Sequence, residues 1–205
     1  MTESSKTPYV YAAALLIAVL GIYLPSMGNG LVFDDLRLSD GTIFGEYGSL
    51  LQIKQRMLSY GSFVWIQDLF GDGWWKQRTV NLALHLGVVA ALFALLKSLI
   101  GMARFPQEFE EQEHFVRSRA AALRVGVALF ALNPVAVYAV AYLAQRSILM
   151  ATLFAVLACW MFVRGLQTSR ASWFAGALLS YVAAVLSKEY AVMTVAMAVP
   201  LYIFV

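Results

Sequence analysis

Residues 79–100, TVNLALHLGVVAALFALLKSLI, form an apolar run in which Lys97 is the only residue with a full charge. As a helix rising 1.5 Å per residue, the run is long enough to cross the roughly 30 Å hydrocarbon core of a bilayer. The other residues show the same bias, since 61% of the 205 residues are hydrophobic and only 13% are charged. Adding the 14 glycines raises the apolar share to about 68%, against about 45–50% in soluble domains. This composition excludes a soluble enzyme, a secreted disulfide scaffold and a disordered tail.

Five further segments have similar apolar character, which predicts an all-α fold: a polytopic membrane bundle of about six transmembrane helices in a single domain over residues 1–205. The first of them could pass for the core of a signal peptide, but no small-residue cleavage site follows it, so we expect a retained helix. A large outer loop is predicted over residues 27–78 and a cytoplasmic loop over residues 102–120. The six predicted spans are residues 9–25, 79–100, 121–141, 147–164, 172–187 and 190–205.

The outer loop contains a stretch with helical periodicity. Over residues 46–60, EYGSLLQIKQRMLSY, the apolar side chains of Leu50, Ile53 and Met57 fall on one helical stripe. This pattern predicts an amphipathic interfacial helix along the membrane surface. Three tryptophans in the same loop are of the residue type that settles at the headgroup level.

Basic residues near the span ends give the expected orientation. With the N-terminus in the cytoplasm, eight of the 15 Lys and Arg residues lie inside and seven outside. The shorter loops favour this arrangement. We therefore predict a multi-pass protein of the cell membrane whose N-terminus is cytoplasmic. The net charge of only +3, with scattered basic residues, gives no indication of nucleic-acid binding.

Several polar residues lie in or beside the predicted spans, where a charge costs roughly 2.5–3.5 kcal/mol on insertion scales. An acidic pair, Asp34 and Asp35, is expected at the outer surface. The polar residues expected on the same side are Arg78, Asn133, Arg146 and Lys188. A carboxylate pair ringed by cations suits an anionic lipid headgroup together with an acid or base step. The simpler interpretation of the acidic pair is a solvated turn after Gly28-Asn29-Gly30.

Five sequence blocks follow in an order and spacing that resemble one family. They are LVFDD (31–35), R-x-L-S (56–59), VNLALH (80–85), LFALNPVAVYAVAYLAQRSILMATLF (129–154) and LSKEYAV (186–192). Together they resemble the membrane half of the GT-C superfamily of multi-spanning glycosyltransferases. Within it, the nearest branch looks like the protein O-mannosyltransferase-like proteins with tetratricopeptide repeats, including their bacterial relatives. Related modules continue through further spans, so we expect the N-terminal part of a longer module or a shortened natural form, in the inner membrane.

The resemblance implies transfer of a sugar from a polyprenyl-phosphate-linked donor to a protein or glycan hydroxyl on the extracytoplasmic face. It implies a catalytic role for Asp34 and Asp35, one carboxylate acting as general base and the other orienting it or the acceptor. The residues then expected to bind the lipid phosphate or the substrate are Arg56, Arg78, His85, Asn133, Arg146, Lys188 and Glu189.

Two departures from the family pattern affect these expectations. Relatives usually carry His-Pro where this chain has Asn133-Pro134, and Arg-Pro-Leu where it has Arg56-Met57-Leu58. His85 lies one turn after Asn81 on the second predicted span. A histidine in such a span forms a hydrogen bond between helices more often than it takes part in catalysis. An acidic pair suits a divalent cation, but we do not expect an obligatory metal.

A second function stays open beside the enzyme. The chain can be a non-catalytic integral subunit, shaped like or derived from such a module, that packs against other membrane subunits and lipids. No proton relay or pair of broken helices is evident in the spans, which disfavours a secondary transporter.

Overall fold

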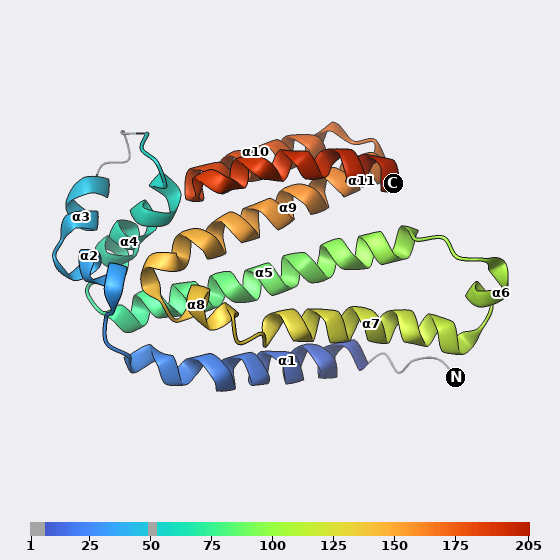
Figure 1. The fold of residues 1–205 in the computed structure, drawn as a ribbon, viewed down its shortest axis with the longest axis horizontal. Helices are drawn as coiled ribbons and strands as arrows, with labels where there is room; N and C mark the ends of the chain where they lie inside the picture. The colour runs from blue at the N-terminus through green and yellow to red at the C-terminus, as the bar shows by residue number, and fades with distance from the viewer. Residues whose placement is uncertain (1–6, 49–52) are drawn as a thin grey trace.

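The computed structural model describes residues 7–48 and 53–205, and this part of the chain is helical with no strand. The prediction of an all-α fold is therefore confirmed. Figure 1 shows the longest helices lying side by side along one axis of the molecule. These are α1 (Thr7–Tyr23), α5 (Trp74–Met102), α7 (Glu113–Ala131), α9 (Arg146–Thr168) and α10 (Ala171–Ser187).

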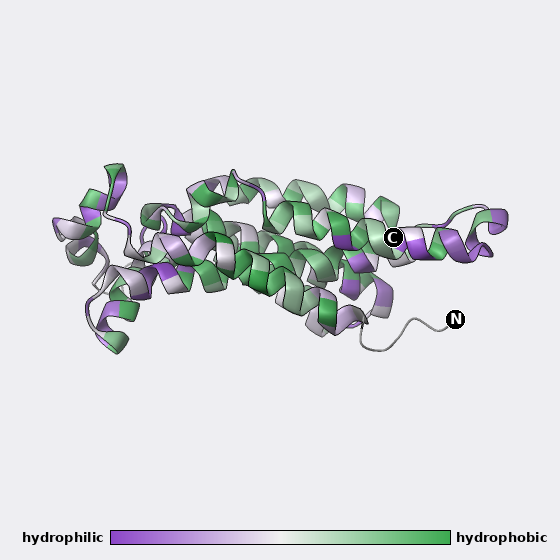
Figure 2. Cartoon of the chain, turned by 90° about the horizontal axis from the view of Figure 1, so that it is seen from below, coloured by the Kyte–Doolittle hydropathy of each residue, from purple (hydrophilic) through white to green (hydrophobic). Residues whose placement is uncertain are grey.

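Three helical segments in the described residues are long and apolar enough to cross a membrane: Pro8–Gly28, Trp74–Met102 and Leu143–Thr168. The 29 residues of α5 correspond to about 43 Å at 1.5 Å per residue, which exceeds the roughly 30 Å hydrocarbon core. Hydrophobic residues occupy the middle of the bundle and hydrophilic residues gather toward its two ends (Figure 2). These features are consistent with a membrane protein.

The predicted span 121–141 is not one helix. Helix α7 ends at Ala131, and the short α8 (Ala136–Val140) begins after a turn at Asn133-Pro134. Proline has no backbone N–H and disfavours helical geometry in the preceding residue. The side chain of Asn133 stabilises the turn, because its Oδ1 accepts the N–H of Val135 at 2.9 Å.

The last two predicted spans are shorter than a full membrane crossing. Helix α10 has 17 residues. The segment after it consists of a 3-10 helix, η4 (Glu189–Met197), followed by the seven-residue α11 (Ala198–Phe204). By length and composition, six membrane-spanning helices are therefore not established.

The predicted amphipathic helix over residues 46–60 is not continuous. Helix α3 (Thr42–Tyr47) ends at the second residue of the stretch, and residues 53–56 are not helical. Arg56 has a left-handed backbone with φ of 59°, and α4 (Met57–Phe70) begins after it. Leu50 lies outside the described residues. Figure 1 shows α4 clustered with α2 (Leu36–Ser39) and α3 at one end of the bundle, hereafter the loop end.

Buried apolar clusters hold these elements together, and two of them position the loop end. One joins α1, α5, α7 and α9 through residues that include Val19, Leu82, Val127 and Leu149. The other, at the loop end, comprises Leu38, Ile43, Tyr60, Phe63 and Leu143. The second cluster packs α2, α3 and α4 onto the 3-10 helix η3 (Leu143–Gln145) that leads into α9. It therefore fixes the loop end against the start of α9, where the candidate site lies.

Candidate functional site

The two adjacent aspartates of η2 (Phe33–Asp35) have different environments at the loop end. The side chain of Asp35 is 1% exposed, and its two carboxylate oxygens accept the backbone N–H groups of Leu143 at 3.2 Å and Ala144 at 2.7 Å. Asp34 is exposed, and its backbone N–H donates to Tyr142 Oη at 2.7 Å. The pair is therefore divided into a buried, hydrogen-bonded carboxylate and an accessible one.

Burial has an electrostatic effect on Asp35. Desolvation raises the pKa of its carboxyl group, and the hydrogen bonds from Ala144 and Leu143 and the charge of Arg78 oppose this rise. Both oxygens are used in holding η3 against η2. This arrangement suits a positioning role for Asp35. It suits proton exchange with a substrate less well.

Arg146, the first residue of α9, is fully buried and surrounded by neutral groups. Its Nε donates to Asn81 Oδ1 at 2.7 Å and its Nη1 to Ser62 Oγ at 3.1 Å. Its Nη2 donates to the backbone oxygen and Oε1 of Gln77 at 2.7 and 2.8 Å. The guanidinium also lies 3.8 Å from the centroid of the Phe63 ring. Arg146 thus fastens α4, α5 and α9 together and does not present its donors to a lipid phosphate.

Two other predicted ligands are also occupied by structural contacts. Arg78 is 2% exposed and donates to the backbone oxygens of Met27 at 3.4 Å and Gly30 at 3.0 Å, so it braces the turn after α1. His85 is 1% exposed, with Nε2 3.0 Å from the backbone oxygen of Ala131. This contact joins α5 to α7, as expected of a histidine that hydrogen-bonds between helices.

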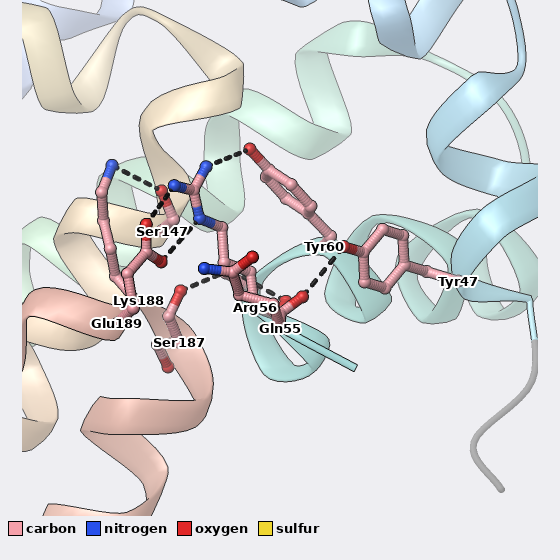
Figure 3. Close-up of polar contacts among 9 residues, drawn as sticks. Tyr47, Gln55, Arg56, Tyr60, Ser147, Ser187, Lys188 and Glu189 are labelled. Carbon is pink, nitrogen blue, oxygen red and sulfur yellow. Dashed lines mark hydrogen bonds and ion pairs between the residues drawn. The ribbon is translucent and has the colours of Figure 1, made fainter. Parts of the chain in front are cut away.

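Arg56 and Glu189 form a two-pronged ion pair between α4 and the start of η4 (Figure 3). Arg56 Nε donates to Glu189 Oε2 at 2.8 Å, and its Nη2 pairs with Oε1. A further bond of 3.1 Å runs from Arg56 Nη1 to Tyr60 Oη. The hydrogen bonds from Arg56 lower the pKa of Glu189 to about 2. Both side chains are partly exposed, so the Arg56–Glu189 pair forms an ordered, accessible polar surface beside Lys188, hereafter the rim.

Lys188 uses few of its donors. Its Nζ lies 3.4 Å from Ser147 Oγ, a contact drawn as a dashed line in Figure 3. Within residues 7–48 and 53–205 no carboxylate is close enough to pair with it. Burial and the charge of Arg56 lower the pKa of Lys188, while the charges of Glu189 and Asp34 raise it. The Asp34 carboxylate therefore lies within electrostatic range of this ammonium group.

The structure thus brings part of the predicted site together at the loop end. Asp34, Arg56, Lys188 and Glu189 lie there in or beside an accessible region, whereas Asn133 makes a turn after α7 and has no hydrogen bond to any of them. In the described ranges no group of three His, Cys, Asp or Glu side chains is arranged to hold a metal ion.

Sequence reasoning missed three polar residues of this region. Tyr142 lies against Asp34, and Ser62 and Gln77 bind Arg146. Gln77 gave a detectable signal, since it precedes Asn81 by one turn and both are polar residues on one face of an apolar helix. Tyr142 and Ser62 gave none, because their partners lie far away in the chain.

Comparisons of the chain with models of known protein families, with curated proteins and with solved structures gave no match. The residues of this chain are therefore the basis for assigning it a function.

Proposed function

We propose that the chain is the membrane part of a glycosyltransferase that moves a sugar from a polyprenyl-phosphate donor to an acceptor hydroxyl on the extracytoplasmic face. One observation carries the proposal: at the loop end the carboxylate of Asp34 is exposed, and a half-buried ammonium, Lys188, pairs with no carboxylate in the described ranges. An acceptor hydroxyl needs a base, and a departing lipid phosphate needs a cation.

In this mechanism Asp34 takes the proton of the acceptor hydroxyl as the hydroxyl oxygen attacks the anomeric carbon. The bond from that carbon to the phosphate oxygen breaks, and the phosphate leaves with the electron pair, so the anomeric configuration is inverted. Lys188 stabilises the negative charge that develops on the phosphate. Asp35 acts as a positioning residue, because its bonds to Leu143 and Ala144 hold η2 in place.

Arg56 supplies a second cation at the same rim. Three of its donor nitrogens bind Glu189 and Tyr60, and a guanidinium has five N–H groups in all. Two N–H groups are thus left for a phosphate oxygen. Glu189 orients the guanidinium, so its contribution to phosphate binding is indirect.

The proposal includes a topology with a cytoplasmic N-terminus and the loop end outside. Helices α7 and α10 and the η4–α11 segment also lie in the membrane in this arrangement. Their exposed apolar side chains support it, among them Leu129, Leu179 and Ile203, which are 68%, 71% and 78% exposed. Such surfaces are stable against lipid or further helices, and not against water.

The direct test is a transfer assay on membranes that contain the full-length gene product and labelled polyprenyl-phosphate sugars. We expect Asp34→Asn to reduce transfer by about 10²-fold or more, the usual contribution of a general base. Lys188→Gln is expected to reduce it as well. The matched control is Asp68→Asn, which removes an exposed carboxylate from α4 and should leave transfer unchanged. Full transfer by Asp34→Asn would exclude the assigned base.

A non-catalytic membrane subunit is the second candidate, and a specific observation favours it. Asp35, Arg78 and Arg146, three of the predicted site residues, are at most 2% exposed and bonded to the protein itself. A protein that kept these residues for folding alone would show no transfer with any donor, and would co-purify in mild detergent with a membrane partner in fixed proportion.

A further inference from the structure

A cavity of about 610 Å³ opens between α5, α9 and α10 at the end of the bundle opposite the loop end. Its polar and aromatic lining comprises Lys97, Ser98, Trp160, Arg164, Gln167 and Trp173. No Asp or Glu contributes to the lining. The cavity therefore carries two positive charges and no negative one.

Both cations lie toward the ends of their helices, away from the middle of the bundle. Lys97 is nine residues beyond Val88, the midpoint of α5, which places it about 13 Å along the helix axis from that midpoint. Arg164 is eight residues beyond Val156, which lies at the middle of the Leu143–Thr168 span, at a similar distance of about 12 Å. Half of the hydrocarbon core is about 15 Å thick. With the helix midpoints at the bilayer centre, the two charges would lie just below the phospholipid headgroups.

The cavity is ordered on one side and open on the other. Arg164 Nη1 donates to Gln167 Oε1 at 3.0 Å, and the guanidinium lies 5.7 Å from the centroid of the Trp173 ring. Trp173 in turn packs edge-to-face on Trp160 with ring centroids 5.5 Å apart. Lys97 is exposed and, in the part of the chain that the structure describes, has no hydrogen bond or ion pair. One cation is therefore held in place, and the other is free to close on a ligand.

We propose that this cavity binds the headgroup of an anionic phospholipid, with the phosphate between Lys97 and Arg164. Two cations without a carboxylate match a phosphate that bears a net negative charge, and the lining holds no carboxylate to pair with the cationic amine of a zwitterionic lipid. Tryptophan pairs at this depth are suited to the glycerol and headgroup region. The apolar side of the cavity, formed by Phe93, Ala94 and Met102, accommodates the upper part of an acyl chain, which free phosphate lacks.

Native mass spectrometry of the purified protein in mild detergent tests this site. The protein is titrated with phosphatidylglycerol and, in parallel, with phosphatidylcholine of the same acyl chains. We expect the wild type to bind the first phosphatidylglycerol about tenfold more tightly, since each Lys or Arg at a membrane surface contributes measurably to anionic-lipid binding. The Lys97→Gln, Arg164→Gln double variant should reduce this preference to less than about twofold.

The matched control is the Arg117→Gln, Arg170→Gln double variant, which removes the same charge from exposed positions outside the cavity lining. It should keep the full preference for phosphatidylglycerol. The proposal is overturned if the wild type shows no preference, if the cavity variant keeps it, or if both double variants lose it equally. If the Lys97→Gln, Arg164→Gln double variant fails to fold, the single variant Lys97→Gln tests the proposal. Its preference for phosphatidylglycerol is expected to be about threefold lower than that of the wild type.

Discussion

The backbone N–H of Ala144 donates a 2.7 Å hydrogen bond to Oδ1 of Asp35, joining residues 109 positions apart in the chain. The neighbouring N–H of Leu143 binds the other carboxylate oxygen. Asp35 therefore connects the segment after α1 to the start of α9. Its neighbour Asp34 is exposed and its backbone N–H donates to Tyr142 Oη, so two adjacent identical side chains have different environments.

Substitution of each aspartate by asparagine should show the difference between the two environments as a difference in stability. Asparagine has one acceptor oxygen, so Asp35→Asn leaves one buried N–H without a partner and is expected to cost about 1–3 kcal/mol. Asp34→Asn is exposed and should change stability by less than about 0.5 kcal/mol. Thermal unfolding in detergent, followed by circular dichroism, measures both. Equal melting temperatures for the two variants would contradict the structural role of Asp35.

The helical architecture could be predicted from the sequence because its causes are local. Apolar runs such as residues 79–100 are long enough to span a bilayer wherever they occur in the chain. The helix bounds differ from the predicted ones where one residue changes the backbone, as at Pro134, which lies between α7 and α8, and at Arg56, whose left-handed backbone precedes α4. Neither residue interrupts the hydrophobic pattern of its segment. The periodicity of apolar residues therefore did not show where each helix is interrupted.

The site was harder to predict because residue type does not show what a side chain binds. Arg146, directly before a predicted span, was expected to meet a phosphate, since a charge in or beside a membrane span usually faces a functional cavity. In the structure Asn81, Gln77 and Ser62 satisfy it, and these partners lie 65 to 84 residues away. Lys188 is identical in charge, yet among the described residues its hydrogen bonding is limited to a long contact with Ser147. Distinguishing the two required the fold.

Arg146→Lys should destabilise the protein although it keeps the charge. A lysine ammonium has three donors at one point and cannot reach Asn81, Ser62 and Gln77 together or stack on Phe63. We expect a loss of about 2–4 kcal/mol, because several buried acceptors lose their donor. Melting in detergent provides the measurement, with the exposed Arg170→Lys as control. A substrate-binding arginine would instead show an unchanged melting temperature and reduced transfer.

The Arg56–Glu189 pair should make stability depend on pH in a defined interval. The pKa of Glu189 falls from its ordinary value of 4.5 to about 2 when it binds Arg56. A lowered carboxyl pKa stabilises the folded state above pH 4.5, and the effect is lost as the pH falls toward 2. The difference in stability between wild type and Glu189→Gln should therefore be constant from pH 7 to about 5.5 and shrink below pH 4.5.

The size of this effect is limited by solvent. The side chains of Arg56 and Glu189 are 29% and 44% exposed, so a double-mutant cycle should give a coupling of about 0.2–1 kcal/mol at pH 7. Glu108→Gln, which replaces an exposed glutamate on the short helix α6 (Gln107–Glu110), is the control and should show no such interval. A coupling that stays the same from pH 7 to pH 2 would exclude the ion pair as its source.

Substitution by alanine should have opposite effects on the melting temperature at two glycines in long helices. At Gly165, in α9, an added Cβ would lie 2.9 Å from ring atoms of Phe174 in α10, which is closer than such contacts allow. At Gly126, in α7, an added Cβ meets nothing within 4 Å. Alanine favours a helix by roughly 0.5–1 kcal/mol over glycine, so Gly126→Ala should raise the melting temperature. Gly165→Ala should lower it, because the packed α9–α10 contact must open. A higher melting temperature for Gly165→Ala than for wild type would show that the Phe174 ring moves aside at little cost.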